Sequence, residues 1–137
     1  MQITTPLSDE LAQYLNLSGL ELKLTAQNMA NVDVPGYKSV GFNFADAMQE
    51  SIKDAMAVRN GNGAGWDGIA AMGTDGEFAG AVDVGKVDGL VERPDGNNVS
   101  MDREGMNMAE AQLQFNVGEE LLKREFTRVM DAIHEDK

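Results

Sequence analysis

Two long segments at opposite ends of the chain repeat apolar residues at the helical period, and they constrain the fold more than any other feature. In the segment 7–31, one set of apolar side chains falls in an arc about 120° wide, as in a helix that covers a core. The set comprises Leu7, Leu11, Tyr14, Leu15, Leu22, Ala26 and Met29. The segment 100–134 has a matching stripe of Met108, Ala111, Phe115, Leu122, Phe126, Val129 and Ile133. The sequence therefore predicts a mainly α fold whose long N- and C-terminal helices pair as a coiled-coil-like hairpin.

Each predicted helix carries a second apolar stripe, well away from the first. The two stripes consist of Leu17, Leu20 and Leu24 in the first helix and of Met106, Leu113, Val117 and Leu121 in the second. A second stripe is covered either by another helix of the same chain or by another subunit. We predict an assembly interface made by Leu17, Leu20, Leu24, Leu113, Val117 and Leu121. The alternative is that a third helix covers a second stripe.

Residues 26–38 contain several signals that end the first predicted helix and turn the chain. Asn31 lies where a left-handed C′ residue is needed, a role that Asn fills when Gly does not. Pro35 and Gly36 are typical of a type II turn, which requires positive φ at the glycine. Asn28 and Asn31 share one side of the last turn. Their amides can therefore cap the helix only, or bond the outgoing strand or a neighbouring chain.

The remaining segments complete a single unit over residues 1–137. Ser8 is predicted to cap the first helix, and Ser100 to cap the last, with Asp102 and Glu104 favouring the dipole of its first turn. Residues 32–59 contain the turn, an extended segment at 38–44 and a helix at 45–59. Residues 60–98 hold 10 of the 15 glycines. They are predicted to form a loop-rich or partly disordered insert, with a hairpin near Thr74–Gly76.

Composition excludes several kinds of function. The chain has no cysteine, and its one histidine, His134, lies in the charged tail. A net charge of −12 would repel nucleic acid. There is no long apolar run for a membrane span and no secretory signal. The carboxylates match no calcium-binding pattern and no nucleophile–base pair. We therefore predict no catalytic, cofactor-binding or metal-binding residues, and no enzyme.

Two motifs resemble a known family. Residues 28–38, Asn-Met-Ala-Asn-Val-Asp-Val-Pro-Gly-Tyr-Lys, resemble the ANxANxxTPGYK signature of flagellar rod and hook proteins. Residues 95–104, Asp-Gly-Asn-Asn-Val-Ser-Met-Asp-Arg-Glu, resemble the DGNxVxxDxE box that opens the C-terminal helix of a proximal-rod member of that family. The structural motif residues by this resemblance are Asn28, Asn31, Pro35, Gly36 and Tyr37.

The resemblance implies a structural subunit of the bacterial flagellar basal body. Such a subunit would polymerise through its terminal helices into the hollow drive shaft of the proximal rod. Its partners would be copies of itself, other rod proteins, the adaptor between the rod and the membrane ring, and the flagellar export apparatus. It would reach the periplasmic rod without a cleaved signal peptide. The alternatives are another axial rod or hook subunit, or a soluble acidic helical-hairpin binding module.

Overall fold

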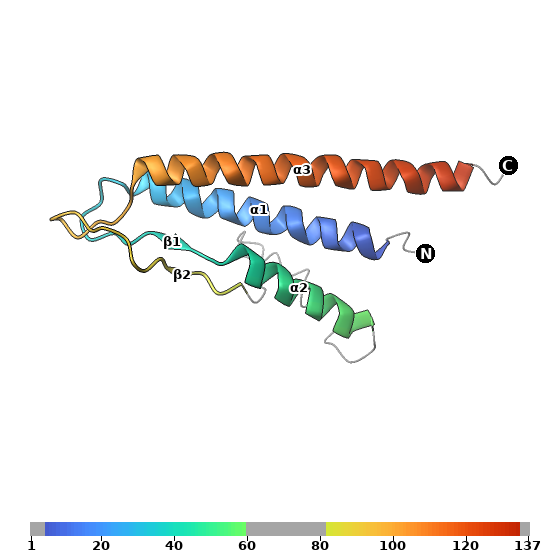
Figure 1. Cartoon of the computed structure of the whole chain (residues 1–137), viewed down its shortest axis with the longest axis horizontal. Coiled ribbons are helices and arrows are strands. Elements are labelled where there is room, and N and C mark those ends of the chain that lie inside the picture. The colour runs from blue at the N-terminus through green and yellow to red at the C-terminus, as the bar shows by residue number, and fades with distance from the viewer. Residues whose placement is uncertain (1–4, 60–81, 135–137) are drawn as a thin grey trace.

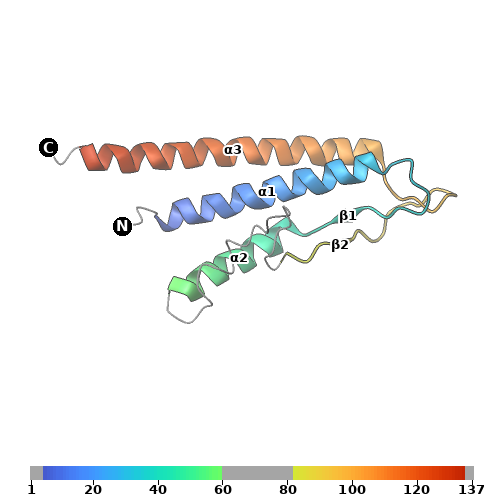
Figure 2. The ribbon, with the colours of Figure 1, turned by 180° about the vertical axis from the view of Figure 1, so that it is seen from behind.

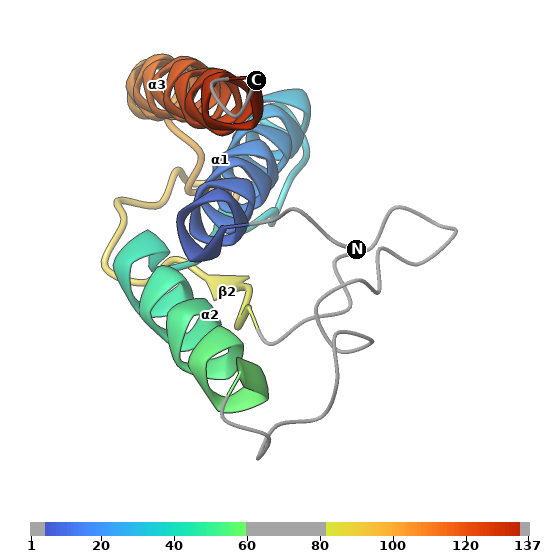
Figure 3. The same ribbon diagram turned by 90° about the vertical axis from the view of Figure 1, so that its right-hand side faces the viewer.

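A computed structural model describes residues 5–59 and 82–134 of the chain. Its frame is an antiparallel pair of helices, α1 (Pro6–Ala30) and α3 (Met101–His134), which run side by side (Figures 1 and 2). The predicted mainly α fold with a helical hairpin is confirmed. α1 lies in the middle of the molecule, with α3 on one side and the remaining elements on the other (Figure 3).

The N-cap of α1 lies three residues earlier than predicted. Thr5, not Ser8, is the N-cap, and its side chain accepts a hydrogen bond from the Ser8 backbone N–H at 3.1 Å. In return, the Ser8 hydroxyl oxygen accepts a hydrogen bond from the Thr5 backbone N–H at 2.9 Å, and the two bonds form a capping box. The prediction missed this because Pro6 was placed before the helix, whereas its fixed φ suits the first helical turn.

The inner face of α3 follows a strict alternation of four- and three-residue steps. The buried and half-buried residues at this spacing are Glu104, Met108, Ala111, Phe115, Gly118, Leu122, Glu125 and Val129. This is the heptad spacing of a coiled-coil seam. At Gly118 the helices approach closely, since an added Cβ would lie 2.9 Å from Cδ1 of Tyr14. Gly19, the other mid-helix glycine, has open space instead.

The second stripe of α1 lies inside the chain. Leu17, Leu20 and Leu24 are 2%, 8% and 9% exposed and form most of the apolar core. In the folded chain this stripe therefore matches the alternative prediction, in which elements of the same chain cover it. The reason is that β1 and α2 pack on α1, so that both of its apolar sides are covered. Conversely, Leu7, Phe126 and Ile133, predicted to face the core, are about half exposed.

A thin antiparallel ribbon connects the hairpin to a third helix. Strand β1 (Val40–Gly41) pairs with β2 (Gly85–Lys86), with Val40 opposite Lys86. Helix α2 (Phe44–Arg59) follows, as predicted, and the side chain of Asn43 accepts from its first backbone N–H groups. The extended segment therefore ends before Phe44, because the Asn43 cap starts the helix there and the Phe44 ring packs edge-on against Tyr14.

Only the end of the Gly-rich insert belongs to the described residues. The hairpin predicted near Thr74–Gly76 lies outside them. Residues 82–98 contribute β2 and a turn at 93–96, and this part ends in the buried residues Asn97 and Asn98. Among the described helices, none has the length and apolar character needed to cross a membrane.

Candidate functional site

The two sequence motifs meet at one end of the hairpin, where α1 ends and α3 begins (Figure 1). We call this region, residues 28–40 with residues 93–104, the motif junction. Five of its polar side chains are at most 6% exposed: Asn28, Ser39, Asn97, Asn98 and Glu104. Buried polar groups must be hydrogen-bonded to be tolerated, so the partners of each define what this junction does.

Asn28 joins the last turn of α1 to the outgoing strand. Its amide nitrogen donates to the Val40 carbonyl at 2.8 Å, and its amide oxygen accepts from the Val40 N–H at 2.9 Å. The remaining capacity is used by Glu104, which accepts at 3.1 Å, and by the Tyr37 hydroxyl, which donates at 3.2 Å. An amide offers two donors and two acceptor sites, so Asn28 is fully satisfied. A shorter, longer or charged side chain could not replace all four bonds.

Glu104 brings the start of α3 into the same network. The side chain is 1% exposed, and besides Asn28 its carboxylate accepts from the Ser39 hydroxyl at 3.2 Å and from the Arg103 guanidinium at 2.6 Å. Arg103 also donates to Ser39 at 3.1 Å. A buried carboxylate is stable only with such charge-assisted partners. The sequence predicted Glu104 in the first turn of the last helix, where it lies, but it gave no sign that this residue is buried on the seam facing α1.

Asn97, which belongs to the second motif, caps the C-terminal end of α1. It is fully buried, and its amide nitrogen lies within 3.1 Å of the carbonyl oxygens of Asn31, Val32 and Val34. Its amide oxygen accepts from the Val99 N–H at 2.7 Å. The carbonyls that follow the last helical turn have no helical partner of their own. One side chain from the second motif therefore adds a buried donor to three carbonyls of the first motif.

The predicted turn is present, with one correction. Gly36 has φ +73°, and the Tyr37 N–H donates to the Val34 carbonyl at 3.2 Å, as the Pro35–Gly36 turn requires. Asn31, however, has φ −103° and is not left-handed. Its N–H bonds Gln27 and Asn28 and its side chain donates to the Gln27 carbonyl, so the helix end is closed without positive φ.

The structure thus brings the five predicted motif residues together and adds others to them. Asn28 and Tyr37 bond each other, whereas Pro35 and Gly36 shape the turn and Asn31 closes the helix. The junction residues that sequence reasoning missed are Ser39, Asn97, Asn98, Arg103 and Glu104. Four of these five residues belong to the second motif, and this membership was the signal that could have revealed them. The sequence analysis did not predict that side chains of the second motif contact the first.

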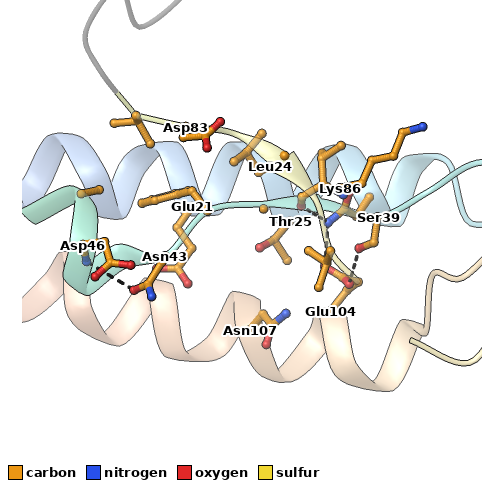
Figure 4. A pocket seen from close by; sticks show the side chains of 18 of the residues that line it. Glu21, Leu24, Thr25, Ser39, Asn43, Asp46, Asp83, Lys86, Glu104 and Asn107 are labelled. Carbon is orange, nitrogen blue, oxygen red and sulfur yellow. Dashed lines mark hydrogen bonds between the residues drawn. The ribbon is translucent and has the colours of Figure 1, made fainter. Parts of the chain in front are cut away.

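A groove beside the junction has a volume of about 920 Å³ and runs between α1, the ribbon, α2 and the start of α3 (Figure 4). The carboxylates along it come from Glu21, Asp46, Glu50, Asp83 and Glu104, and the cations from Lys86 and Arg103. Burial, with a smaller contribution from Glu110, raises the pKa of Glu21 above its usual value. No group of His, Cys, Asp or Glu within the described ranges is arranged to hold a metal ion.

The six predicted interface residues separate into two groups. Leu17, Leu20 and Leu24 lie in the core, whereas Leu113, Val117 and Leu121 lie on the surface of α3 and are 65%, 47% and 45% exposed. Of the six predicted interface residues, those available to a partner are therefore the three on α3.

Comparison with known proteins extends the motif resemblance to most of the chain. The chain is 29% identical over 124 residues to the flagellar basal body rod protein FlgB of Salmonella typhimurium, covering 87% of this chain and 86% of that protein. It is 25% identical over 123 residues to FlgB of Yersinia ruckeri, covering 88% of each. The resemblance to flagellar rod proteins is confirmed. Both relatives are named as flagellar basal body rod proteins, and no family model matches the chain.

Proposed function

We propose that this protein is a structural subunit of the flagellar basal body, in the proximal rod, and that it acts by assembly rather than catalysis. The observation that carries this proposal is similarity to two FlgB rod proteins over about seven-eighths of the chain. Nearly the whole of each relative is matched, so the likeness is not confined to one shared motif.

The geometry supports separate roles for two regions of such a subunit. The motif junction fixes how the chain leaves α1, and the exposed apolar stripe of α3 provides surface for association. Copies would associate head to tail through α3, an open contact that builds a helical tube. The finished rod would be a hollow shaft in the periplasm, with other rod proteins, the adaptor to the membrane ring and the export apparatus as neighbours. The subunit would enter it through that apparatus without cleavage of a signal peptide.

The test places a charge on the exposed stripe. Leu113→Asp and Leu121→Asp would bury an unpaired carboxylate between subunits, at a cost of several kcal/mol. Gln112→Asp, an exposed site on another side of the same helix, introduces the same charge and is the control. Each variant is expressed in a flagellated strain that lacks its own copy of the protein, and motility and basal-body yield are scored at matched expression.

The stripe variants are expected to abolish basal-body assembly, and Gln112→Asp is expected to leave it intact. In the same strain, an epitope-tagged wild-type chain should co-purify with basal bodies. Normal motility in the stripe variants would refute the proposed contact on α3. Absence of the tagged chain from motile cells' basal bodies would refute the rod role itself.

A further inference from the structure

The outer surface of α3 carries seven residues whose spacing along the helix is symmetric about the central one, Val117. The steps between them are 4, 3, 4, 4, 3 and 4 residues, and the positions are Met106, Glu110, Leu113, Val117, Leu121, Arg124 and Arg128. At 100° per residue all seven lie within about 40° of one direction, so they form a single ridge. All seven are exposed, and none belongs to the seam with α1.

We propose that two copies of this chain pair along this ridge, antiparallel, with Val117 on the two-fold axis. Leu113 then packs against Leu121 of the partner subunit, and Glu110 faces Arg124 of the partner subunit. Met106 covers the aliphatic stem of the partner's Arg128. The occupant of the ridge is thus a second copy of the chain, held by three apolar layers at the centre and a charge pair on either side.

Charge complementarity selects the antiparallel arrangement. In a parallel, in-register pair, Glu110 would face its own copy and Arg124 would face its own copy, and both contacts are repulsive. Reversing one helix turns both repulsions into attractions. The existing intrahelical pair of Arg124 with Glu120 does not compete strongly, because both side chains are more than half exposed and such pairs contribute little.

The surroundings of α3 leave room for this partner. Among the described elements, the helix packed on α3 is α1, which contacts the seam on a different side of α3 from the ridge, whereas β1 and α2 pack on α1 (Figure 3). The ridge from Met106 to Arg128 is about 33 Å long at 1.5 Å per residue. A second helix can therefore lie along it over its full length.

A two-fold contact of this kind closes on itself and cannot grow. It would cover the same leucines that the proposed head-to-tail contact uses, and would hold the free subunit as a soluble dimer. The pairing does not depend on the rod role, since it follows from the exposed surface of α3.

Charge reversal tests the pairing in the purified full-length chain. Glu110→Arg and Arg124→Glu are each expected to weaken the dimer about tenfold in sedimentation equilibrium, because each creates two like-charge contacts per dimer. The double variant is expected to restore the dissociation constant to near the wild-type value. A wild-type chain that stays monomeric at millimolar concentration would overturn the proposal, as would a double variant weaker than both single variants. Circular dichroism confirms that each variant is folded.

Cysteine cross-linking tests the axis independently, because the natural chain has no cysteine. Val117→Cys is expected to form a disulfide-linked dimer on mild oxidation, whereas Gln112→Cys, exposed on another side of α3, is not. A mixture of Leu113→Cys and Leu121→Cys chains is expected to give the mixed dimer, with little of either homodimer. Two homodimers without the mixed species would indicate a parallel pair and refute the two-fold arrangement.

Discussion

The two ends of the helical hairpin are built in opposite ways. At the motif junction, buried amides, a hydroxyl and a carboxylate are joined by hydrogen bonds. At the far end, the described contact that ties α1 to α3 by a side-chain bond is Thr5 donating to Glu125 at 2.9 Å. Beyond Glu125, α3 continues to His134 past the start of α1, and its apolar side chains are about half exposed: Phe126, Met130 and Ile133.

This contrast separates two structural tasks. Hydrogen bonds are directional, and a buried network permits one arrangement of its members. Apolar contact is non-directional and scales with area. The junction therefore sets the register of α1 against α3 and the exit of the chain, whereas the outer surface of α3 remains available for association.

The largest effect is expected from Glu104→Ala. The substitution removes the carboxylate shared by Asn28, Ser39 and Arg103, and leaves buried donors without an acceptor. We expect unfolding in urea to show a loss of about 3 kcal/mol. Asp102→Ala, which removes an exposed acid from the same helical turn, is the control and should cost under about 0.5 kcal/mol. Equal losses would show that Glu104 acts only through the helix dipole.

Gly36→Val tests the turn that directs the chain out of α1. With φ +73° and no atom within 4 Å of an added Cβ, Gly36 is required for its backbone conformation and not for space. We expect destabilisation of about 1–2 kcal/mol, since a β-branched residue is disfavoured at positive φ. Gly85→Val, in open space without positive φ, should be close to neutral in the same thermal melts. A neutral Gly36→Val would mean that the turn does not constrain the junction.

Glu21→Gln tests the middle of the hairpin, where burial raises the pKa of the carboxyl. One carboxylate oxygen of Glu21 is buried and has no hydrogen-bond partner among the described residues. An acid with a raised folded pKa destabilises the fold when ionised, and this loss is relieved as pH falls through that pKa toward 4.5. Glu21→Gln is therefore expected to be more stable than wild type at pH 7, by less than about 1 kcal/mol.

The advantage of Glu21→Gln should shrink as pH falls from neutrality toward 4.5, and Glu119→Gln, at an exposed site, should show no such trend. Melting temperatures across this pH range measure both. An advantage that grew on acidification would contradict the sign.

The smallest effect on the folded chain is expected at the far end. Met130→Gln removes an apolar side chain that is already 53% exposed, so the free energy of unfolding should change by less than about 0.5 kcal/mol. A loss as large as that of Glu104→Ala would mean that the far end is as tightly built as the junction.

Periodicity predicted the elements well because each helix satisfies its own pattern. α1, α2 and α3 lie close to their expected bounds, and the Pro35–Gly36 turn follows from backbone restrictions that act locally. Periodicity could not decide which of two apolar stripes faces inward. Leu17, Leu20 and Leu24 became core only because β1 and α2 pack on α1, which is a tertiary event.

At the motif junction, the contacts between residues near in sequence could be predicted, and the contacts between distant residues could not. A bond from Asn28 to the outgoing strand was one of the roles that the sequence left open, and the structure shows it between partners that are near in sequence. The bond from Asn28 to Glu104 spans 76 residues and leaves no local signal. Asn97 shows the same limit, because a capping donor for α1 that arrives from residue 97 looks, in its own segment, like an ordinary turn residue.

The long separation between Asn28 and Glu104 also orders the folding of the chain. Bringing together residues 76 apart costs about 4 kcal/mol of chain entropy from loop length alone, and that cost must be met before the junction forms. Asn31 closes the end of α1 with local bonds, but the additional donor to the carbonyls of Asn31, Val32 and Val34 comes only from residue 97. Native structure at the junction therefore requires residues 97–104, which lie in the last third of the chain.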